Sequence, residues 1–383
     1  MMSIKIRFQL AVSSLIQGFK ARKTFKKINQ LVADDLKIIA SLPSHSSQGA
    51  GTLIIKCDDI GDFLVWQQVI PTIVQHAPKP LVFVGNLAIK PLYENFFDFA
   101  DTVIWVDKKK WGNASYRQSI YQQVNQIQAE LAFTPLFTRN FIMDDLILAA
   151  SGAPKRYVWD RNHHAYFPDM SLLDAHSGIQ IHSDAPLKLE YFRNIEFISK
   201  VLKLNLEEKV KVLFPDFKKY RTLIVVPVAS AGSKTWSAEN FARTISAVIN
   251  DFDKCILIAG PNGVEAASKI CELAGSPKII NLVNQTQLNE AFAFIGEASV
   301  LLTLDTFASH VGVLTATNTV LISNGTNWQR FANYAPYVSS AFISIMPPHV
   351  DPEANKLKLG YSSSEINTIK VETVVKAIKS LNA

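Results

Sequence analysis

The chain lacks three features that define large classes of proteins. Its cysteines number only three, are far apart and have no CxxC spacing. This argues against a disulfide framework and a structural zinc site, and favours a reducing compartment. No apolar run approaches the roughly 18 residues that a membrane-spanning helix needs. No GxGxxG motif follows a strand that would open a nucleotide-binding fold, so a dinucleotide oxidoreductase is not expected.

Acidic residues are absent from positions 1–27, which carry seven basic residues: Lys5, Arg7, Lys20, Arg22, Lys23, Lys26 and Lys27. The remaining chain has 39 − 7 = 32 basic residues against all 33 acidic ones, so the net charge of +6 lies in this arm. A near-neutral body gives no basic face for nucleic acid, and we expect no nucleic-acid partner.

Two interpretations of the arm remain open. It could lie on an anionic membrane surface, because the apolar residues Phe8, Val12, Leu15, Ile16 and Phe19 lie beside its basic ones. It could equally be a solvated helical extension that packs on the neighbouring domain. A secretory signal is not expected, since the apolar stretch 8–19 is interrupted by Gln and Ser residues. We therefore expect a cytoplasmic protein, with peripheral contact at the inner face of the cytoplasmic membrane under the first interpretation.

The length of 383 residues corresponds to two domains with full cores. Short apolar runs alternate with helical patterns, which predicts parallel sheets with crossover helices. In the first half we expect strands at 52–57, 81–84 and 102–106, a helix at 63–76, an irregular region from 114 to 205, and a helix at its end, 189–202. In the second half we expect strands at 222–226, 255–259, 278–280, 300–304 and 319–322, and helices at 238–250, 264–273, 288–295 and 365–381.

The stretch from Val300 to Leu314 contains the strongest local signal. Its apolar run ends sharply at Asp305 and Thr306, where a helix should begin. Free backbone N–H groups and the helix dipole make such a start an anion-binding site. The carboxyl edge of a parallel sheet is also where open α/β folds place their ligands. Asp-Thr before a helix is also common as a plain N-cap, and this interpretation stays open.

Four stretches fall at comparable strand ends, and their order and spacing are more specific than any one of them. They are residues 60–62 (IGD), 234–241 (KTWSAENF), 259–263 (AGPNG) and 305–310 (DTFASH). Together they resemble glycosyltransferase family 9, the family that contains the bacterial ADP-heptose:lipopolysaccharide heptosyltransferases. The resemblance covers roughly residues 50–340.

The resemblance implies an α/β protein with the GT-B fold, in which the parallel sheets of two Rossmann-like domains face each other across a cleft. It divides the chain into a basic N-terminal helical extension (1–47), a Rossmann-like acceptor domain (48–205) and a Rossmann-like nucleotide-sugar-binding domain (206–383). The implied activity is inverting, metal-independent transfer of a sugar, most simply heptose from ADP-heptose, onto a lipopolysaccharide core or related surface glycan. The nucleotide sugar is then a substrate, and no cofactor or metal is expected.

The resemblance also implies roles for individual residues. Asp62 would be the general base that takes the proton of the acceptor hydroxyl. Gly61, which lets the backbone come close, would be an acceptor-binding residue. Lys234 would offset the charge that develops on the leaving diphosphate, and Ser230 would hydrogen-bond to the same phosphates. Capping of a helix by the carboxylates is the alternative role for the Asp62 segment, and simple solvation is the alternative for Lys234.

The remaining donor-binding residues would surround the nucleotide sugar. We expect Asp305 to accept hydrogen bonds from sugar hydroxyls, and Glu265, after Gly260, to accept them from the ribose. The diphosphate would lie on the helix start formed by Thr306, Phe307 and Ala308, with His310 either bonding a phosphate or serving a structural role. Phe307 departs from the family, which usually has Gly there, so its side chain would crowd the phosphate or reshape the sugar pocket.

Basic residues and histidines in the irregular region are candidates for an acceptor groove that holds a phosphorylated sugar. They are Arg156, Arg161, His163, His164 and Lys188. The histidines lack the paired helical spacing of a zinc site. Asp251 and Asp253 have DxD spacing but precede their strand, so a metal is not expected there either.

Two rival functions remain at this stage. A nucleotide-sugar epimerase on the same architecture would convert its donor without an acceptor. A non-catalytic glycan-binding or assembly protein would have its donor site blocked by Phe307.

Overall fold

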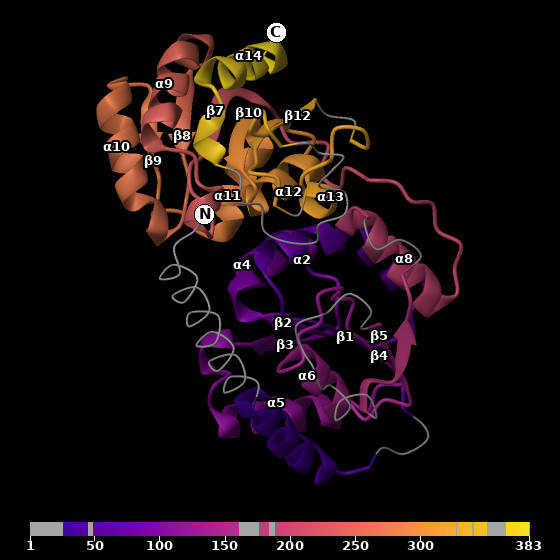
Figure 1. The fold of residues 1–383 in the computed structure, drawn as a ribbon. Coiled ribbons are helices and arrows are strands. Elements are labelled where there is room, and N and C mark those ends of the chain that lie inside the picture. Colours follow the sequence, from indigo (N-terminus) through magenta and orange to yellow (C-terminus); the bar gives the residue numbers. More distant parts are fainter. Residues whose placement is uncertain are drawn as a thin grey trace, which may run out of the picture. The chain divides into compact units, whose positions relative to one another are not determined.

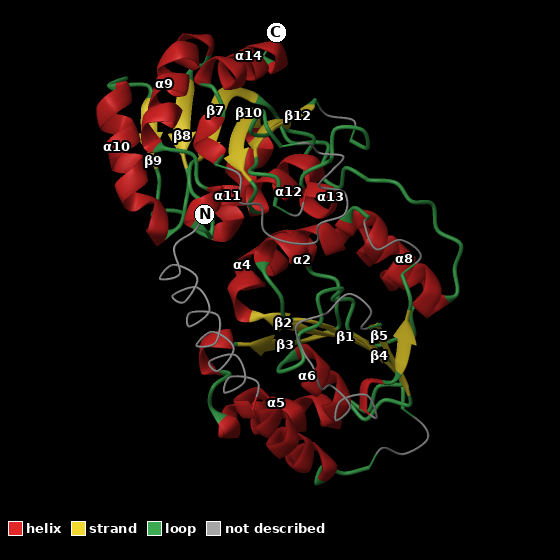
Figure 2. Ribbon diagram, viewed as in Figure 1, coloured by secondary structure: helices red, strands yellow, loops and turns green. Residues whose placement is uncertain are grey.

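The computed structural model describes residues 26–44, 49–160, 176–183, 188–326, 328–338, 341–350 and 365–382. In this part of the chain two six-stranded sheets form, and all neighbouring strands within each sheet are parallel (Figure 1). The secondary structure is an alternation of strands and helices (Figure 2). The predicted α/β class is therefore confirmed.

The first sheet has the order β3-β2-β1-β4-β5-β6. Its strands are β1 (Thr52–Lys56), β2 (Leu81–Asn86), β3 (Thr102–Val106), β4 (Leu131–Phe133), β5 (Lys155–Trp159) and β6 (Ile179–Ile181). The central strand β1 is buried along its whole length, as expected for a parallel strand that reads as a continuous apolar run. Leu53 pairs with Val82 on one side and with Ala132 on the other.

One face of this sheet packs against a helix of residues 26–40, α5 (Ala114–Gln126) and α6 (Asp144–Ala150). The helix of residues 26–40 belongs to this core, because its Asp35 is wholly buried and accepts hydrogen bonds from Arg117 at 2.6 and 2.9 Å. Residues 1–25 and 45–47 of the predicted extension lie outside the described residues.

The second sheet has the order β12-β11-β10-β7-β8-β9. Its strands are β7 (Tyr220–Val226), β8 (Lys254–Leu257), β9 (Ile279–Asn281), β10 (Ala298–Leu304), β11 (Asn318–Ile322) and β12 (Phe342–Ile345). When the strands of each sheet are numbered in chain order, both sheets have the order 3-2-1-4-5-6. The strand order therefore reverses between β1 and β4 in the first sheet and between β7 and β10 in the second.

Helices cover both faces of the second sheet (Figure 2). One face packs against α9 (Ala238–Val248), α10 (Val264–Ala274) and α14 (Val371–Leu381). The other face packs with α12 (Phe307–Leu314) and α8 (Glu190–Leu202), and α11 (Leu288–Glu297) contacts β7 and β10. The predicted elements of this half are confirmed within a few residues at their ends, except that α14 begins at Val371 rather than at 365.

Two predictions for the first half differ from the structure. The region 114–205, expected to be irregular, contributes strands β4, β5 and β6 and helices α5 and α6. Strands β4 and β6 have three residues each, which is too short to show a period, whereas β5 has five. The helix expected at 63–76 is divided into α2 (Ile60–Trp66), a 3-10 turn at Gln67–Val69, and α3 (Ile70–His76).

Contacts divide the chain into two compact units that do not follow the order of the sequence. The first consists of Met1–Cys57, His76–Leu87 and Ala100–Ser183, and contains the first sheet. The second consists of Asp58–Gln75, Ala88–Phe99 and Asp184–Ala383. Helix α2, which follows β1 along the chain, therefore clusters with the second sheet. The sequence-based domain limits remain a prediction. No helix in the described ranges is long and apolar enough to cross a membrane.

Candidate active site

An ion pair lies at the point where the strand order of the second sheet reverses. Beyond the carboxyl end of β7, a 3-10 turn (Gly232–Lys234) carries Lys234, and beyond the adjacent β10 the chain carries Asp305. Lys234 Nζ is 2.9 Å from Asp305 Oδ2. Ligands of open α/β sheets bind at this topological position. Two residues predicted to contact the donor, 71 positions apart in sequence, are thus brought together.

The environment of this pair is mostly buried. The side chains of Lys234 and Asp305 are 15% and 7% exposed. Burial raises the pKa of the Asp305 carboxyl, and the ammonium of Lys234 works against this shift. A cation in such a place interacts strongly with an added anion, because little water screens it.

Helix α12 begins at the predicted position. Thr306 is its N-cap, and its Oγ1 accepts the Ala308 N–H at 3.3 Å. The Ser309 N–H donates to the carbonyl oxygen of Thr306 at 3.2 Å. Phe307, the first residue of the helix, is partly exposed. The N-terminus of α12 therefore fits either prediction, a plain N-cap or an anion-binding site. A bound phosphate oxygen could take the place of Thr306 Oγ1 as the acceptor of the Ala308 N–H.

His310, one turn further along α12, is neutral and buried. Its Nδ1 lies 2.9 Å from the hydroxyl of Tyr334. Burial, and then the positive charge of Lys234, lower its pKa to about 3. The contact with Tyr334 fits the structural role of His310, and because an uncharged imidazole can still hydrogen-bond a phosphate, the phosphate-bonding role stays a prediction.

The first turn of α2 packs directly against this histidine. Asp59 is the N-cap of α2 and Asp62 is the third residue of the helix. Between them, a Cβ added to Gly61 would lie 3.1 Å from His310 Cδ2 and 3.9 Å from the Cα of Phe307. Absence of a side chain at Gly61 thus permits the close approach of α2 and α12. Asp62, the predicted base, is therefore carried by a helix that touches the predicted phosphate-binding helix.

Two charged residues in the same unit as Asp62 were missed from the sequence. Arg330, in α13 (Trp328–Phe331), donates from Nε to Glu190 Oε2 at 2.9 Å. Burial lowers the pKa of Arg330, but the carboxylates of Glu190, Asp62 and Asp58 outweigh burial and raise it. Arg330 and Glu190 are 140 positions apart in the sequence. Each is also more than a hundred positions from Asp62, and no local motif marks either of them.

The other predicted donor residues lie at the same edge of the sheet. Ser230 is exposed and follows β7. Gly260 and Glu265 follow the neighbouring β8; both are exposed, and Glu265 lies in the first turn of α10. Among the described residues no hydrogen bond or ion pair joins these three to Lys234 or Asp305, so their roles rest on the resemblance.

The predicted acceptor residues that the structure describes belong to different compact units, so the acceptor groove stays a prediction. Arg156 lies on β5 in the first unit and donates to the carbonyl oxygen of Ala153 at 2.8 Å. Lys188 belongs to the second unit and forms ion pairs with Glu196 at 3.1 Å and Glu208 at 2.5 Å. Arg161, His163 and His164 lie outside the described residues.

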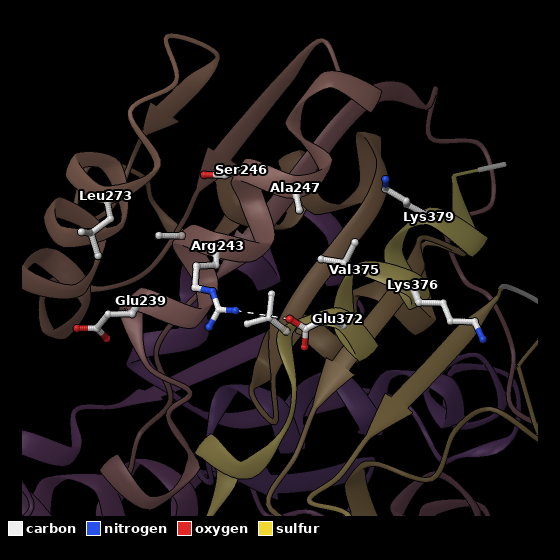
Figure 3. Close-up of a pocket in the computed structure, with 11 residues that line it drawn as sticks. Glu239, Arg243, Ser246, Ala247, Leu273, Glu372, Val375, Lys376 and Lys379 are labelled. Carbon is white, nitrogen blue, oxygen red and sulfur yellow. Dashed lines mark ion pairs between the residues drawn. The ribbon is translucent and has the colours of Figure 1, made fainter.

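A cavity of about 1020 Å³ lies elsewhere in the second unit, between α9, α10 and α14 (Figure 3). Arg243 and Glu372 point toward one another across it, 3.5 Å apart (Figure 3). None of its lining residues is a predicted site residue, and its walls come from the helices on one face of the sheet rather than from strand ends. We do not assign the donor to it.

Solved structures share the fold of this chain at low sequence identity. The glycosyl transferase family 9 protein from Veillonella parvula DSM 2008 has a TM-score of 0.69 at 15% identity, with 88% of this chain and 99% of that chain covered. Escherichia coli heptosyltransferase WaaC with ADP has a TM-score of 0.66 at 15% identity, with 87% of this chain and 99% of that chain covered. Escherichia coli ADP-heptose lipopolysaccharide heptosyltransferase II has a TM-score of 0.61 at 17% identity, with 86% of this chain and 98% of that chain covered. These similarities confirm the GT-B fold.

A search of curated protein sequences finds no match. The family described as "Glycosyltransferase family 9 (heptosyltransferase)" matches residues 146–354, which is more than half of the 383 residues. The match contains Lys234 and the whole β10–α12 unit. The chain therefore belongs to glycosyltransferase family 9, and the predicted glycosyltransferase class is confirmed.

Proposed function

We propose that this glycosyltransferase transfers heptose from ADP-heptose, with inversion and without a metal, onto a lipopolysaccharide core or a related surface glycan. One observation carries the proposal. The helix turn with Asp62 packs on α12, and the Lys234–Asp305 pair lies beside the start of α12. A carboxylate suited to accept a proton and a cation suited to a diphosphate thus belong to one compact unit.

The proposed step is a single displacement. The acceptor hydroxyl oxygen attacks the anomeric carbon, and its proton passes to the Asp62 carboxylate. The bond from the anomeric carbon to the diphosphate oxygen breaks, and its electron pair leaves with ADP. Attack opposite the leaving group inverts the anomeric configuration.

Lys234 and the start of α12 would stabilise the leaving diphosphate. The ammonium offsets the negative charge that grows in the transition state, and the helix N–H groups add hydrogen bonds. With these groups supplying positive charge, we expect transfer to proceed without a divalent cation. Asp305, which already holds Lys234, would orient this ammonium and accept hydrogen bonds from the donor sugar.

The donor and acceptor are supported by family membership and by the structural similarity to ADP-heptose lipopolysaccharide heptosyltransferase II. The donor can be tested without an acceptor, since a ligand that binds only the folded state raises the melting temperature. In a panel of nucleotide sugars we expect ADP-heptose to stabilise the protein most. A larger shift with a UDP or GDP sugar would overturn the donor assignment.

The mechanism is tested by Asp62→Asn. Transfer would be followed by mass spectrometry, with ADP-heptose and a heptose-free lipopolysaccharide core oligosaccharide as substrates. We expect kcat to fall by about 10²–10⁴-fold, because the amide cannot take the proton. Calorimetric titration should show ADP binding close to that of the wild type.

Asp59→Asn is the matched control. It makes the same chemical change on the same turn, but Asp59 is the exposed N-cap residue of α2. We expect it to retain most of the transfer rate. Wild-type turnover by Asp62→Asn would remove Asp62 as the base, whereas equal losses in both variants would indicate a general disturbance of α2.

A further inference from the structure

Tyr334 is a buried tyrosine beside helix α12, and its ring is fixed by its neighbours. Its side chain is wholly buried. The ring packs edge-on against the rings of Tyr191, Phe342 and His310, with centroids 5.5, 5.4 and 5.8 Å away. All four residues belong to the unit that contains the second sheet. The Tyr334 hydroxyl is therefore held in one place, and its oxygen lies 2.9 Å from Nδ1 of His310.

The direction of this hydrogen bond follows from the surroundings of the hydroxyl group. Burial raises the pKa of Tyr334, so the hydroxyl keeps its proton. His310 Nδ1 is its one hydrogen-bond partner among the residues that the structure describes. A buried hydroxyl that donates to no acceptor is unfavourable, because it has given up its hydrogen bonds to water. If Nδ1 carried a hydrogen, the hydroxyl would have no such acceptor, so Nδ1 accepts and Tyr334 donates.

Acceptance by Nδ1 determines the tautomer of His310. The pKa of His310 is about 3, so the ring is uncharged near neutral pH. An uncharged imidazole carries its hydrogen on one ring nitrogen and accepts with the other. With Nδ1 as the acceptor, Nε2 carries the hydrogen and is the donor.

Nε2 of His310 faces the first turn of α2. A Cβ added to Gly61 would lie 3.2 Å from this nitrogen, and Asp62 is the next residue of the same turn. No described group forms a hydrogen bond with Nε2, and His310 is only 4% exposed. A largely buried N–H group without a protein acceptor indicates a partner from outside the chain, such as an oxygen of a ligand.

We propose that Tyr334 is a positioning residue, which holds His310 in the tautomer that directs an N–H donor from Nε2 to a diphosphate oxygen of the bound nucleotide sugar. The inference rests on the proposed function only where it puts this diphosphate at the start of α12. A donor that is fixed before the ligand arrives loses little conformational freedom on binding. Tyr334 thus acts on the substrate through His310 and does not touch it.

The test is nitrogen-15 NMR of the full chain with labelled histidine, in which the His310 signals are assigned by their loss in His310→Gln. The chemical shifts of the two ring nitrogens show which one carries the hydrogen. At pH 7 we expect the hydrogen on Nε2 in the wild type. Tyr334→Phe keeps the ring but removes the hydroxyl, and we expect it to give a mixture of the two tautomers. Hydrogen on Nδ1 in the wild type, or an unchanged tautomer in Tyr334→Phe, would overturn the inference.

Tyr191→Phe is the matched control. It removes a hydroxyl from the buried ring that packs against Tyr334, and it should leave the tautomer of His310 as in the wild type. Equal changes of the tautomer in both variants would mean a general disturbance of the packing and would reject the role of Tyr334.

A second comparison replaces the imidazole with two amide side chains. The amide N–H of glutamine can take the place of Nε2–H, whereas that of asparagine lies near the position of Nδ1. In calorimetric titration with ADP, His310→Gln should stay within about threefold of the wild-type affinity, and His310→Asn should lose about tenfold. If Tyr334→Phe does not fold, this comparison decides: equal losses, or a larger loss in His310→Gln, reject the proposal.

Failure of the proposed function can be distinguished from failure of this inference. If the wild type binds no ADP, the proposed donor is wrong, but the NMR spectra still decide whether Tyr334 sets the tautomer of His310. If the wild type binds ADP and the Nε2 signal does not shift on binding, the donor assignment stands and the contact from His310 is rejected.

Discussion

At the scale of single residues, Asp144 in the first unit shows how burial sets the cost of a charge. It lies in the first turn of α6, is wholly buried, and accepts the Cys57 N–H at 2.8 Å through Oδ1. Its Oδ2 has no hydrogen-bond partner among the described residues. Burial raises its pKa to about 6, opposed by the Cys57 N–H and by the charges of Lys56 and Lys108.

This shift predicts a pH-dependent effect of Asp144→Asn. The folded pKa of about 6 exceeds the ordinary value of 3.8, so between these values the folded state holds a proton that the unfolded state has lost. The free energy of unfolding is therefore not reduced by Asp144 below pH 4, where the carboxyl is protonated in both states. It falls as the pH rises through 6, because the buried carboxyl must then ionise. Because Asn does not ionise, the variant should be more stable than the wild type at pH 8, by up to about 3 kcal/mol, and should lose this advantage at pH 4.

Chemical denaturation at pH 4, 6 and 8 would measure the difference. Asp216→Asn is a suitable control, because Asp216 is exposed and the same substitution there should change the free energy of unfolding little at any pH. An Asp144→Asn variant whose stability relative to the wild type does not change with pH would contradict the assignment of a costly buried carboxylate.

At the scale of elements, the contact between α2 and α12 determines where the predicted base lies. Gly61→Ala would bring a methyl group to 3.1 and 3.2 Å from the His310 ring, which is fixed by burial and by Tyr334. Since the ring has little room to move, we expect a destabilisation of about 1 kcal/mol. The larger effect should be on transfer, because displacement of α2 moves Asp62 relative to α12.

The measurement pairs thermal unfolding with the transfer rate. Gly112→Ala is the matched control, since no atom lies within 4 Å of a Cβ added there. It should leave both quantities close to wild type. Full activity in Gly61→Ala would show that the approach of α2 to α12 is not required for the reaction.

At the scale of the whole molecule, charge is concentrated in the N-terminal arm. Removing residues 1–25 deletes Lys5, Arg7, Lys20, Arg22 and Lys23, which lowers the net charge from +6 to +1. If the arm contacts the membrane, the deletion should abolish cosedimentation with vesicles that contain phosphatidylglycerol. Neutral phosphatidylcholine vesicles should bind neither protein. Equal binding to anionic vesicles by both proteins would reject the membrane interpretation of the arm.

The sequence predicted most of the second half of the molecule. Its strands have four or more residues, with one exception, and are separated by helices with clear apolar periods, so their order along the chain could be inferred. The motifs at the strand ends identified the family, and Asp305, Thr306 and Lys234 were named without coordinates. Strands β4, β5 and β6 of the first sheet were missed; β4 and β6 have three residues each, which do not reveal a period.

Sequence alone determined the α/β class, the family, and which residue types stand at the ends of which strands, because these depend on local pattern. Only the tertiary structure decided which of them meet. It joined Lys234 to Asp305 by placing β7 beside β10. It joined Arg330 to Glu190, which is 140 positions away in the sequence. Such pairings depend on strand order and helix packing, and the side-chain chemistry of a buried charge depends on what surrounds it in space.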